Sequence, residues 1–420
     1  MDKFIINGPC KVKGKVQISG SKNASLPILA ATLLFDKSVE IYNLPNVKDI
    51  ETMLKLLQSL GLRIIRNKFK KSVKIIKTNK IKTLAAYSLV KTMRAGILVL
   101  GPLITKYKKA TTSLPGGCLI GERPVNHHLN ALKKLGMQYN IKKGYIHARV
   151  KKNLVGKKIS FSNKSVGATE NLIMASCLAK GITILKNCAI EPEIKDLVNF
   201  LNKAGAKIKW IGKRSLKIIG VKSLKSIKYN VMGDRIECGT FCVAAVLTAG
   251  KLKIKGFDPK LIYTELSLLK KIGAKIKISV NEINIEGNKK LKNLKNLVTK
   301  EYPYFPTDLQ AQFMVLLSKA NGISRITENI FENRFLHVGE LRRLGAKINV
   351  KNNQAIISGN NDFQGAELMS SDLRASVALV LAALISKGKS TINRIYHLDR
   401  GYENLEQKLK KIGVKIKRVN

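Results

Sequence analysis

The chain has 420 residues, 45% of them hydrophobic, so it can bury a large core, and its length favours two domains or one large repetitive domain. This composition excludes a disordered chain, and no apolar run approaches the roughly 18 residues of a membrane-spanning helix. The net charge is +50, from 77 Lys and Arg against 27 Asp and Glu.

Such a charge suggests nucleic-acid binding, but its distribution argues against this function. Lysines occur in almost every segment and often alternate with Ile, as in residues 274–278, which places them on the solvent face of strands. We therefore expect no nucleic-acid partner and no membrane contact, and we expect a diffuse positive potential that attracts anionic metabolites. A basic binding protein without catalytic activity is the alternative.

The N-terminal residues and the cysteines point to a reducing compartment. Residues 1–9 contain no basic segment followed by an apolar one, so we expect no secretion signal and a cytoplasmic location. No cysteine pair has CxxC spacing, and Cys238 and Cys242 lack a nearby His, so we expect buried packing and no metal site. The six cysteines are Cys10, Cys118, Cys177, Cys188, Cys238 and Cys242.

An internal repeat runs through the whole chain. In each copy an amphipathic helix is followed by a Gly and two short strands, and these glycines recur about every 70 residues. Each Gly stands where a helix C-cap needs a left-handed residue. In chain order the helices and glycines are Leu54–Leu60 with Gly61, Leu129–Leu135 with Gly136, Leu197–Ala204 with Gly205, Leu266–Ile272 with Gly273, Glu340–Leu344 with Gly345, and Leu405–Ile412 with Gly413.

A second helix in each copy is rich in Ala and apolar around most of its circumference, which predicts that it is buried. In chain order these helices are Asn23–Leu34, Val90–Ile104, Ala168–Ala179, Glu237–Thr248, Asp308–Ala320 and Asp372–Ser386. Six copies predict an α/β protein, and two domains of three copies, with buried helices at each centre, suit the size best. One closed array and an α/β solenoid are the alternatives.

Three loops that precede or separate these helices carry candidate functional residues. Residues 20–24 place Lys22 at a helix N-terminus, where anions bind, although Lys22 can also be an ordinary surface lysine. Residues 113–124 surround Cys118 with Gly and Pro, which predicts a mobile loop. A thiol beside Arg123 can act as an acid or a nucleophile, and the alternative is a cysteine placed there by chance.

The third loop, residues 302–310, places Asp308 at the start of a buried helix. Its carboxylate can cap that helix or act as a general base toward a substrate hydroxyl. Asp372 and Arg374 repeat this arrangement, and Arg400 follows. Several arginines, without a metal-ligand cluster or a nucleotide-binding glycine motif, favour an anionic substrate bound without nucleotide hydrolysis.

Seven ordered motifs resemble the UDP-N-acetylglucosamine 1-carboxyvinyltransferases of bacterial cell-wall synthesis over the full length of the chain. They are residues 19–30, 89–95, 114–118, 165–169, 305–308, 331–335 and 399–403. The resemblance implies two inside-out α/β barrel-like domains of three repeats each, one formed by residues 1–21 and 232–420 and the other, with the Cys118 loop, by residues 22–231. It implies transfer of the enolpyruvyl group of phosphoenolpyruvate to the 3′-hydroxyl of UDP-N-acetylglucosamine, the first committed step of peptidoglycan precursor synthesis.

The resemblance also implies a role for individual residues, with no cofactor and no metal. Cys118 is the general acid and the target of fosfomycin, Asp308 accepts the proton of the sugar hydroxyl, and Lys22 is catalytic as well. Residues expected to bind phosphoenolpyruvate are Lys22, Asn23, Arg94, Arg123 and Arg400. Residues expected to bind the sugar nucleotide are Asn23, Arg94, Arg123, Pro124, Val125, Ser165, Val166, Gly167, Asp308, Ile330 and Phe331, and Asp372 and Arg374 support them. We expect a monomer.

Some positions depart from the family pattern, namely Asn126, Asn163 with Lys164, Gly233 and Tyr304. They bear on the affinity for the nucleotide more than on the chemistry. The nearest alternative enzyme is the shikimate-pathway enolpyruvyl transferase, which shares the fold but lacks the Pro-Gly-Gly-Cys loop found here at residues 115–118.

Overall fold

The computed structural model of the chain describes residues 2–114, 116 and 125–419. These residues form two compact units. Unit 1 contains residues 2–19 and 233–419, and unit 2 contains residues 20–114, 116 and 125–232. Among the described residues, the chain leaves unit 1 after Ser19 and returns to it at Gly233.

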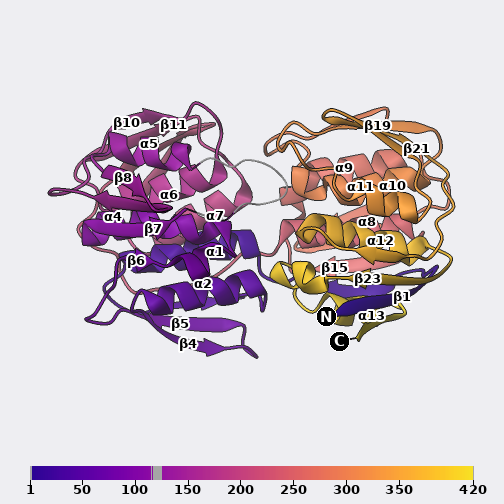
Figure 1. The fold of residues 1–420 in the computed structure, drawn as a ribbon, viewed down its shortest axis with the longest axis horizontal. Helices are drawn as coiled ribbons and strands as arrows, with labels where there is room; N and C mark the ends of the chain where they lie inside the picture. The colour runs from indigo at the N-terminus through magenta and orange to yellow at the C-terminus, as the bar shows by residue number, and fades with distance from the viewer. Residues whose placement is uncertain (1, 115, 117–124, 420) are drawn as a thin grey trace. The chain divides into compact units, whose positions relative to one another are not determined.

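Three buried helices lie at the centre of each unit (Figure 1). Every residue of the first helix in unit 1 is buried, as a helix that is apolar on nearly all sides requires. The central helices of unit 1 are α8 (Arg235–Leu247), α10 (Gln310–Lys319) and α12 (Leu373–Ile385). Those of unit 2 are α1 (Lys22–Ala31), which continues as η1 (Thr32–Leu34), then α4 (Leu100–Tyr107) and α6 (Val166–Ser176).

One of the predicted buried helices is interrupted, so the expectation of a continuous helix over Val90–Ile104 is wrong. The short helix α3 (Tyr87–Val90) ends there, Met93 is extended with φ −144° and ψ 108°, and η2 (Arg94–Val99) leads into α4. The break lets the chain fold back on itself, because a Cβ atom on Gly96 would lie 3.1 Å from a methyl carbon of Val90. An apolar pattern alone does not reveal such a break.

In the part of the chain that the structure describes, six amphipathic helices pack outside the central ones, and the glycine that follows each has φ between 93° and 122°. The prediction of left-handed C-caps is confirmed, since only Gly adopts such angles without strain. The helices are α2 (Lys48–Ser59), α5 (Asn126–Lys134), α7 (Pro192–Lys203), α9 (Tyr263–Ile272), α11 (Val338–Arg343) and α13 (Leu405–Lys411).

The strands of the described residues form six four-stranded sheets, each with one parallel and two antiparallel pairings. In unit 1 the strands in sheet order are β16 (Lys275–Ser279), β17 (Glu282–Glu286), β15 (Lys251–Lys255) and β2 (Lys13–Gln17); β18 (Asn296–Val298), β19 (Ile323–Thr327), β21 (Gln354–Ser358) and β20 (Ile348–Lys351); and β22 (Glu367–Met369), β23 (Gly388–Asn393), β1 (Lys3–Gly8) and β24 (Ile416–Val419).

The sheets of unit 2 follow the same pattern. Their strands in sheet order are β14 (Lys228–Asn230), β3 (Val39–Tyr42), β5 (Ser72–Ile76) and β4 (Arg63–Asn67); β6 (Leu84–Ala85), β7 (Lys109–Ser113), β9 (Tyr145–Arg149) and β8 (Gln138–Lys142); and β10 (Lys158–Ser160), β11 (Ile182–Lys186), β13 (Ser215–Ile219) and β12 (Lys207–Gly212).

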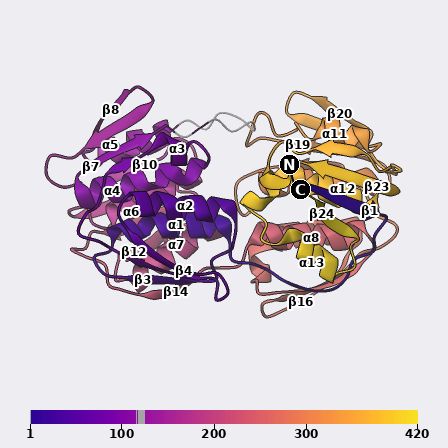
Figure 2. The ribbon, with the colours of Figure 1, turned by 60° about the horizontal axis from the view of Figure 1, so that its bottom comes forward.

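Both units are inside-out α/β structures, with the sheets at the periphery and the helices inside (Figure 2). Segments distant in sequence complete the sheets: β1 pairs with β23 and β24, β2 pairs with β15, and β14 pairs with β3. Each unit has its own hydrophobic core. Within the described part of the chain, no helix combines the length and apolar character required to cross a membrane.

Candidate active site

Two of the buried helices of unit 1 begin at an aspartate that caps them. Asp234 accepts hydrogen bonds from the backbone N–H groups of Ile236 at 2.8 Å and Glu237 at 3.0 Å. Asp372 accepts from the N–H groups of Arg374 at 2.8 Å and of the residue after it at 3.1 Å. These carboxylates satisfy the first N–H groups of α8 and α12 and offset the positive ends of the helix dipoles.

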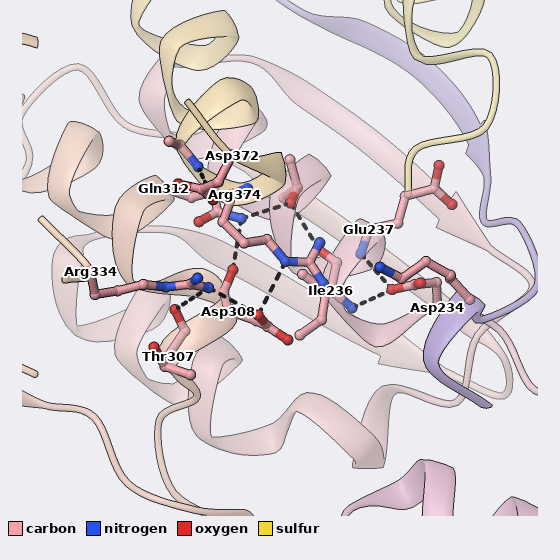
Figure 3. Close-up of polar contacts among 12 residues, drawn as sticks. Asp234, Ile236, Glu237, Thr307, Asp308, Gln312, Arg334, Asp372 and Arg374 are labelled. Carbon is pink, nitrogen blue, oxygen red and sulfur yellow. Dashed lines mark hydrogen bonds and ion pairs between the residues drawn. The ribbon is translucent and has the colours of Figure 1, made fainter. Parts of the chain in front are cut away.

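Asp308 stands at the third helix N-terminus but does not cap it. It lies in η4 (Thr307–Leu309), directly before α10, where no side-chain cap bond forms. Its Oδ1 atom instead accepts from Nη2 of Arg334 at 3.0 Å and from Nε of Arg374 at 3.2 Å (Figure 3). Within the described residues no hydrogen bond reaches Oδ2. The capping interpretation of Asp308 is therefore wrong.

The two arginines determine the charge of Asp308. Burial by itself would raise the pKa of Asp308, but the positive charges of Arg374 and Arg334 outweigh burial and lower this pKa well below its ordinary value. The side chain of Asp308 retains 28% of its exposure, whereas those of Arg334 and Arg374 are almost fully buried. The arrangement presents an ionised carboxylate with one oxygen fixed and the other available to an external hydrogen-bond donor.

A buried glutamate that the sequence did not single out orders the neighbouring loop. Glu328 accepts hydrogen bonds from the hydroxyl of Thr307 at 2.9 Å and from the N–H groups of Ile330 at 2.8 Å and Phe331 at 3.2 Å. The guanidinium of Arg334 lies 5.7 Å from the centre of the Phe331 ring. Glu328 thus holds two predicted nucleotide-site residues beside the loop that carries Asp308.

Arg400 ends η5 (Ile395–Arg400) in unit 1 and is partly buried. It lies near His397, since the pKa of His397 is lowered by burial and then by the charge of Arg400, while Asp372 acts in the opposite direction. The structure therefore brings Arg400 and Asp372 to the same part of unit 1.

The buried helices of unit 2 begin differently. The hydroxyl of Ser21 accepts from the N–H of Ala24 at 3.2 Å, and the hydroxyl of Ser165 accepts from the N–H of Ala168 at 3.3 Å. These caps carry no charge, so the positive ends of α1 and α6 are not offset by their own capping residues. Lys22 is the first residue of α1, and its Nζ atom pairs with Oδ2 of Asp49 at 3.2 Å.

His128, in the first turn of α5, contacts residues of α6. Its Nδ1 atom accepts from the side-chain amide of Asn171 at 3.1 Å, and a Cβ atom on Gly167 would lie 3.2 Å from its ring. Burial, followed by the charges of His127 and Arg94, lowers the pKa of His128 to about 4, so the ring is neutral at pH 7. The first turns of α5 and α6 therefore bring together five of the predicted residues, namely Arg94, Val125, Ser165, Val166 and Gly167.

Other predicted positions are exposed or lie outside the described residues. Asn23 follows Lys22 in α1 and is partly exposed. The predictions for Cys118, Arg123 and Pro124 fall outside the described part of the chain. Among the residues that departed from the family pattern, Asn126 is exposed and Tyr304 is 57% exposed.

The described residues contain no group of three or more His, Cys, Asp and Glu side chains that could hold a metal ion. Cys238 and Cys242, which the sequence placed on one helix, are buried and form no disulfide.

Comparisons with known proteins agree on the fold and the family. Residues 6–409 match the family model described as EPSP synthase (3-phosphoshikimate 1-carboxyvinyltransferase). The enolpyruvyl transferase NikO from Streptomyces tendae superimposes with a TM-score of 0.90 over 100% of this chain and 99% of that one, at 23% identity. EPSP synthase from Acinetobacter baumannii superimposes with a TM-score of 0.78 at 18% identity, with both chains fully covered.

Closer relatives carry a more specific name. The UDP-N-acetylglucosamine 1-carboxyvinyltransferase of Pelagibacter ubique (strain HTCC1062) is 63% identical, and the protein of the same name from Acinetobacter baylyi (strain ATCC 33305 / BD413 / ADP1) is 46% identical. Both matches cover 100% of each chain. The chain therefore belongs to the EPSP synthase family and, within it, to the UDP-N-acetylglucosamine 1-carboxyvinyltransferases.

Proposed function

We propose that the chain transfers the enolpyruvyl group of phosphoenolpyruvate to the 3′-hydroxyl of UDP-N-acetylglucosamine and releases phosphate. Full-length relatives at 46% and 63% identity bear the name of this activity. The observation within the structure that supports the proposal is the state of Asp308. It is an ionised carboxylate that caps no helix, and one of its oxygens is fixed by two arginines. In a cell the reaction would commit the sugar nucleotide to peptidoglycan, and through it to cell shape and division.

The reaction proceeds by addition and then elimination. In the addition, the methylene carbon of phosphoenolpyruvate takes up a proton while the 3′-oxygen bonds to the adjacent carbon, which gives a tetrahedral intermediate that still carries phosphate. In the elimination, the new methyl group loses a proton and the bond to the phosphate oxygen breaks. One hydroxyl is consumed and one inorganic phosphate leaves, and no redox change occurs.

Asp308 is proposed to accept the proton of the 3′-hydroxyl. Because its pKa is well below that of an alcohol, it cannot remove this proton from the free hydroxyl to any extent. The proton becomes acidic only as the oxygen bonds to carbon, so transfer to Asp308 accompanies bond formation. The low pKa keeps Asp308 ionised, and therefore able to accept, throughout the neutral pH range.

Positive groups are proposed to hold the charged substrate. The phosphate and carboxylate of phosphoenolpyruvate would be bound by Lys22, Arg94, Arg123 and Arg400. The uncharged cap of α1 leaves a positive helix end beside Lys22. Fixed charges of this kind stabilise the negative charge that moves onto phosphate. Cys118 would deliver the proton to the methylene carbon.

The remaining predicted residues are proposed to bind the sugar nucleotide. Asn23 would anchor the sugar, and Asp372 and Arg374 would complete the charged wall beside Asp308. The uridine diphosphate would lie against Arg123, Pro124, Val125, Ser165, Val166, Gly167, Ile330 and Phe331. We further propose that the two units are the two enolpyruvyl transferase domains and that the protein acts as a cytoplasmic monomer.

The direct test is phosphate release from phosphoenolpyruvate by the purified chain. We expect release that requires UDP-N-acetylglucosamine and is absent with shikimate 3-phosphate or without an acceptor. Release that depends on shikimate 3-phosphate would assign the chain to the activity named by its family model. No release from folded protein with either acceptor would refute the proposal.

The role of Cys118 has its own test. Cys118→Ala should suppress phosphate release, and the variant should no longer be alkylated by fosfomycin, which mass spectrometry detects as a mass increase on the wild-type chain only. The same labelling in Cys118→Ala would assign the reactive thiol to another cysteine.

A further inference from the structure

A buried tyrosine lies directly behind the pair formed by Asp308 and Arg374. Tyr402 is 3% exposed, and the guanidinium of Arg374 lies 5.8 Å from the centre of its ring. Nη1 of Arg374 donates to the Tyr402 hydroxyl at 3.4 Å, while Nε of the same guanidinium donates to Asp308 at 3.2 Å. Two nitrogen atoms of one planar group are therefore bound to different partners.

The contact between Tyr402 and Thr240 determines the direction of each hydrogen bond in the series that begins at Arg374. The hydroxyl of Thr240 lies 2.8 Å from that of Tyr402 and also donates to the carbonyl of Ile236 at 2.8 Å. A hydroxyl has one proton, so Thr240 accepts from Tyr402, and the oxygen of Tyr402 is left to accept from Arg374. The order of donation is Arg374 to Tyr402, Tyr402 to Thr240, and Thr240 to Ile236.

These contacts join the three central helices of unit 1. Thr240 lies on α8 and Arg374 on α12. Gln312 on α10 donates its amide to Thr240 at 3.4 Å and to the backbone carbonyl of Asp308 at 3.0 Å. Because Thr240, Gln312 and Tyr402 are buried, water cannot replace a lost partner easily, and each bond restricts the geometry of the next.

The pairing of Arg374 with Asp308 has an unusual form that this network explains. An arginine and a carboxylate commonly pair through two parallel hydrogen bonds, which occupy both carboxylate oxygens. Here Arg374 and Arg334 both bind Oδ1. A guanidinium that is held at Nε by Oδ1 of Asp308 and at Nη1 by Tyr402 cannot turn to bring Nη2, the nitrogen that pairs alongside Nε, to Oδ2.

We infer that Tyr402 is a positioning residue, whose hydroxyl holds the Arg374 guanidinium so that Oδ2 of Asp308 stays available to the acceptor hydroxyl. The inference rests on the proposed function of Asp308. Without the hydroxyl, Arg374 can rotate and bind both oxygens of Asp308, which would strengthen the ion pair and remove the acceptor. Thr240 serves the same purpose one bond further away.

The test is the kinetics of Tyr402→Phe, which keeps the ring beneath Arg374 and removes only the hydroxyl. We expect kcat for sugar-dependent phosphate release to fall about tenfold, with the KM of both substrates changed less than about twofold, because the bound substrates are kept but the reacting oxygen is misplaced. Thr240→Val should show a smaller loss of the same kind. Tyr263→Phe, at an exposed tyrosine of the same unit, is the matched control and should behave as wild type.

A double-mutant cycle separates positioning from a general loss of structure. If Tyr402 acts through Asp308, Tyr402→Phe should reduce kcat in the wild-type background and not in the Asp308→Asn background. An equal reduction in both backgrounds, or wild-type kcat in Tyr402→Phe, would overturn the inference. If Tyr402→Phe does not fold, the same cycle with Thr240→Val in place of Tyr402→Phe tests the inference. Failure of the wild-type chain itself to release phosphate would instead refute the proposed function.

Discussion

The buried helices of the two units begin with different kinds of residue. In unit 1, α8 and α12 begin at Asp234 and Asp372, whose carboxylates cap the helices. In unit 2, α1 and α6 begin at Ser21 and Ser165, whose hydroxyls cap them. The fold of the repeat is the same in both units, so the difference concerns charge rather than architecture.

This difference in charge predicts that the helix N-termini of unit 2, and not those of unit 1, bind anionic ligands. A helix N-terminus with a neutral cap keeps its positive end for an anionic ligand, and Lys22 in the first turn of α1 adds a further positive charge. Where the cap is acidic, its carboxylate already offsets the partial positive charge of the helix N-terminus. Asp308 departs from both patterns, since it stands at a helix start without capping it and is held by arginines instead. Such a carboxylate is available for chemistry.

The largest effect is expected from Asp308→Asn, which removes the carboxylate that stands at the start of a buried helix without capping it. We expect kcat for phosphate release to fall on the order of 10³-fold, the usual range for loss of a general base. The change also leaves the buried charges of Arg334 and Arg374 without their shared partner, so urea unfolding should show a loss of about 3 kcal/mol. Asp362→Asn, at an exposed position in the same unit, is the control. Unchanged kcat would contradict the special status of Asp308.

The second prediction concerns protein stability at acid pH. The hydrogen bond from Asn171 of α6 to His128 of α5 requires a neutral histidine. Folded His128 has a pKa of about 4, against about 6.5 for an unfolded histidine. Between these values the unfolded chain binds more protons, so stability falls as pH decreases from about 6.5 to 4.

His128→Gln keeps an acceptor for Asn171 but cannot be protonated. It should lessen the destabilisation between pH 7 and pH 4.5 by on the order of 2 kcal/mol, measured by urea unfolding at both values. His147→Gln, at an exposed histidine of the same unit, is the matched control variant for this measurement. Equal acid sensitivity in wild type and His128→Gln would show that His128 is not the responsible group.

A third change exchanges the kind of cap in unit 2. Ser21→Asp retains a good capping oxygen, so stability should change by less than about 1 kcal/mol. The added negative charge beside Lys22 should nevertheless raise the KM for phosphoenolpyruvate about tenfold, which corresponds to roughly 1.4 kcal/mol. Added salt should reduce the difference by screening. An unchanged KM would mean that the neutral cap has no part in anion binding.

The smallest effect is expected from the reverse exchange in unit 1. Asp234→Ser keeps a capping oxygen for the N–H groups of Ile236 and Glu237 but removes the charge that offsets the dipole of α8. We expect a loss of about 0.5 kcal/mol in the free energy of unfolding. A loss of several kcal/mol in urea unfolding would show that Asp234 has a structural role beyond capping.

Most of the fold could be predicted because it rests on local patterns. The six glycines mark helix ends by a backbone angle that few other residues adopt, and the Ala-rich segments are buried because they have no polar face. The break at Met93 could not be predicted, since a single Gly inside an apolar pattern does not reveal that Val90 packs against Gly96.

The site was harder to predict because its determinants are distant in sequence. Asp308 and Asp372 have similar neighbours, a hydroxyl residue before and a leucine after, yet only Asp372 caps its helix. The difference arises from Arg334 and Arg374, which lie 26 and 66 residues beyond Asp308. Glu328 combines local contacts to Ile330 and Phe331 with a distant one to Thr307. Tyr402 lies in the motif at residues 399–403, but that motif does not indicate its contact with Arg374.

The most direct test of the central claim is a structure of the chain with UDP-N-acetylglucosamine bound. The account predicts that the sugar 3′-oxygen lies about 2.6 to 3.2 Å from Oδ2 of Asp308, while Oδ1 remains bound to Arg334 and Arg374. A 3′-oxygen beyond hydrogen-bonding reach of Asp308, or an Asp308 whose two oxygens are both taken by arginine, would contradict it.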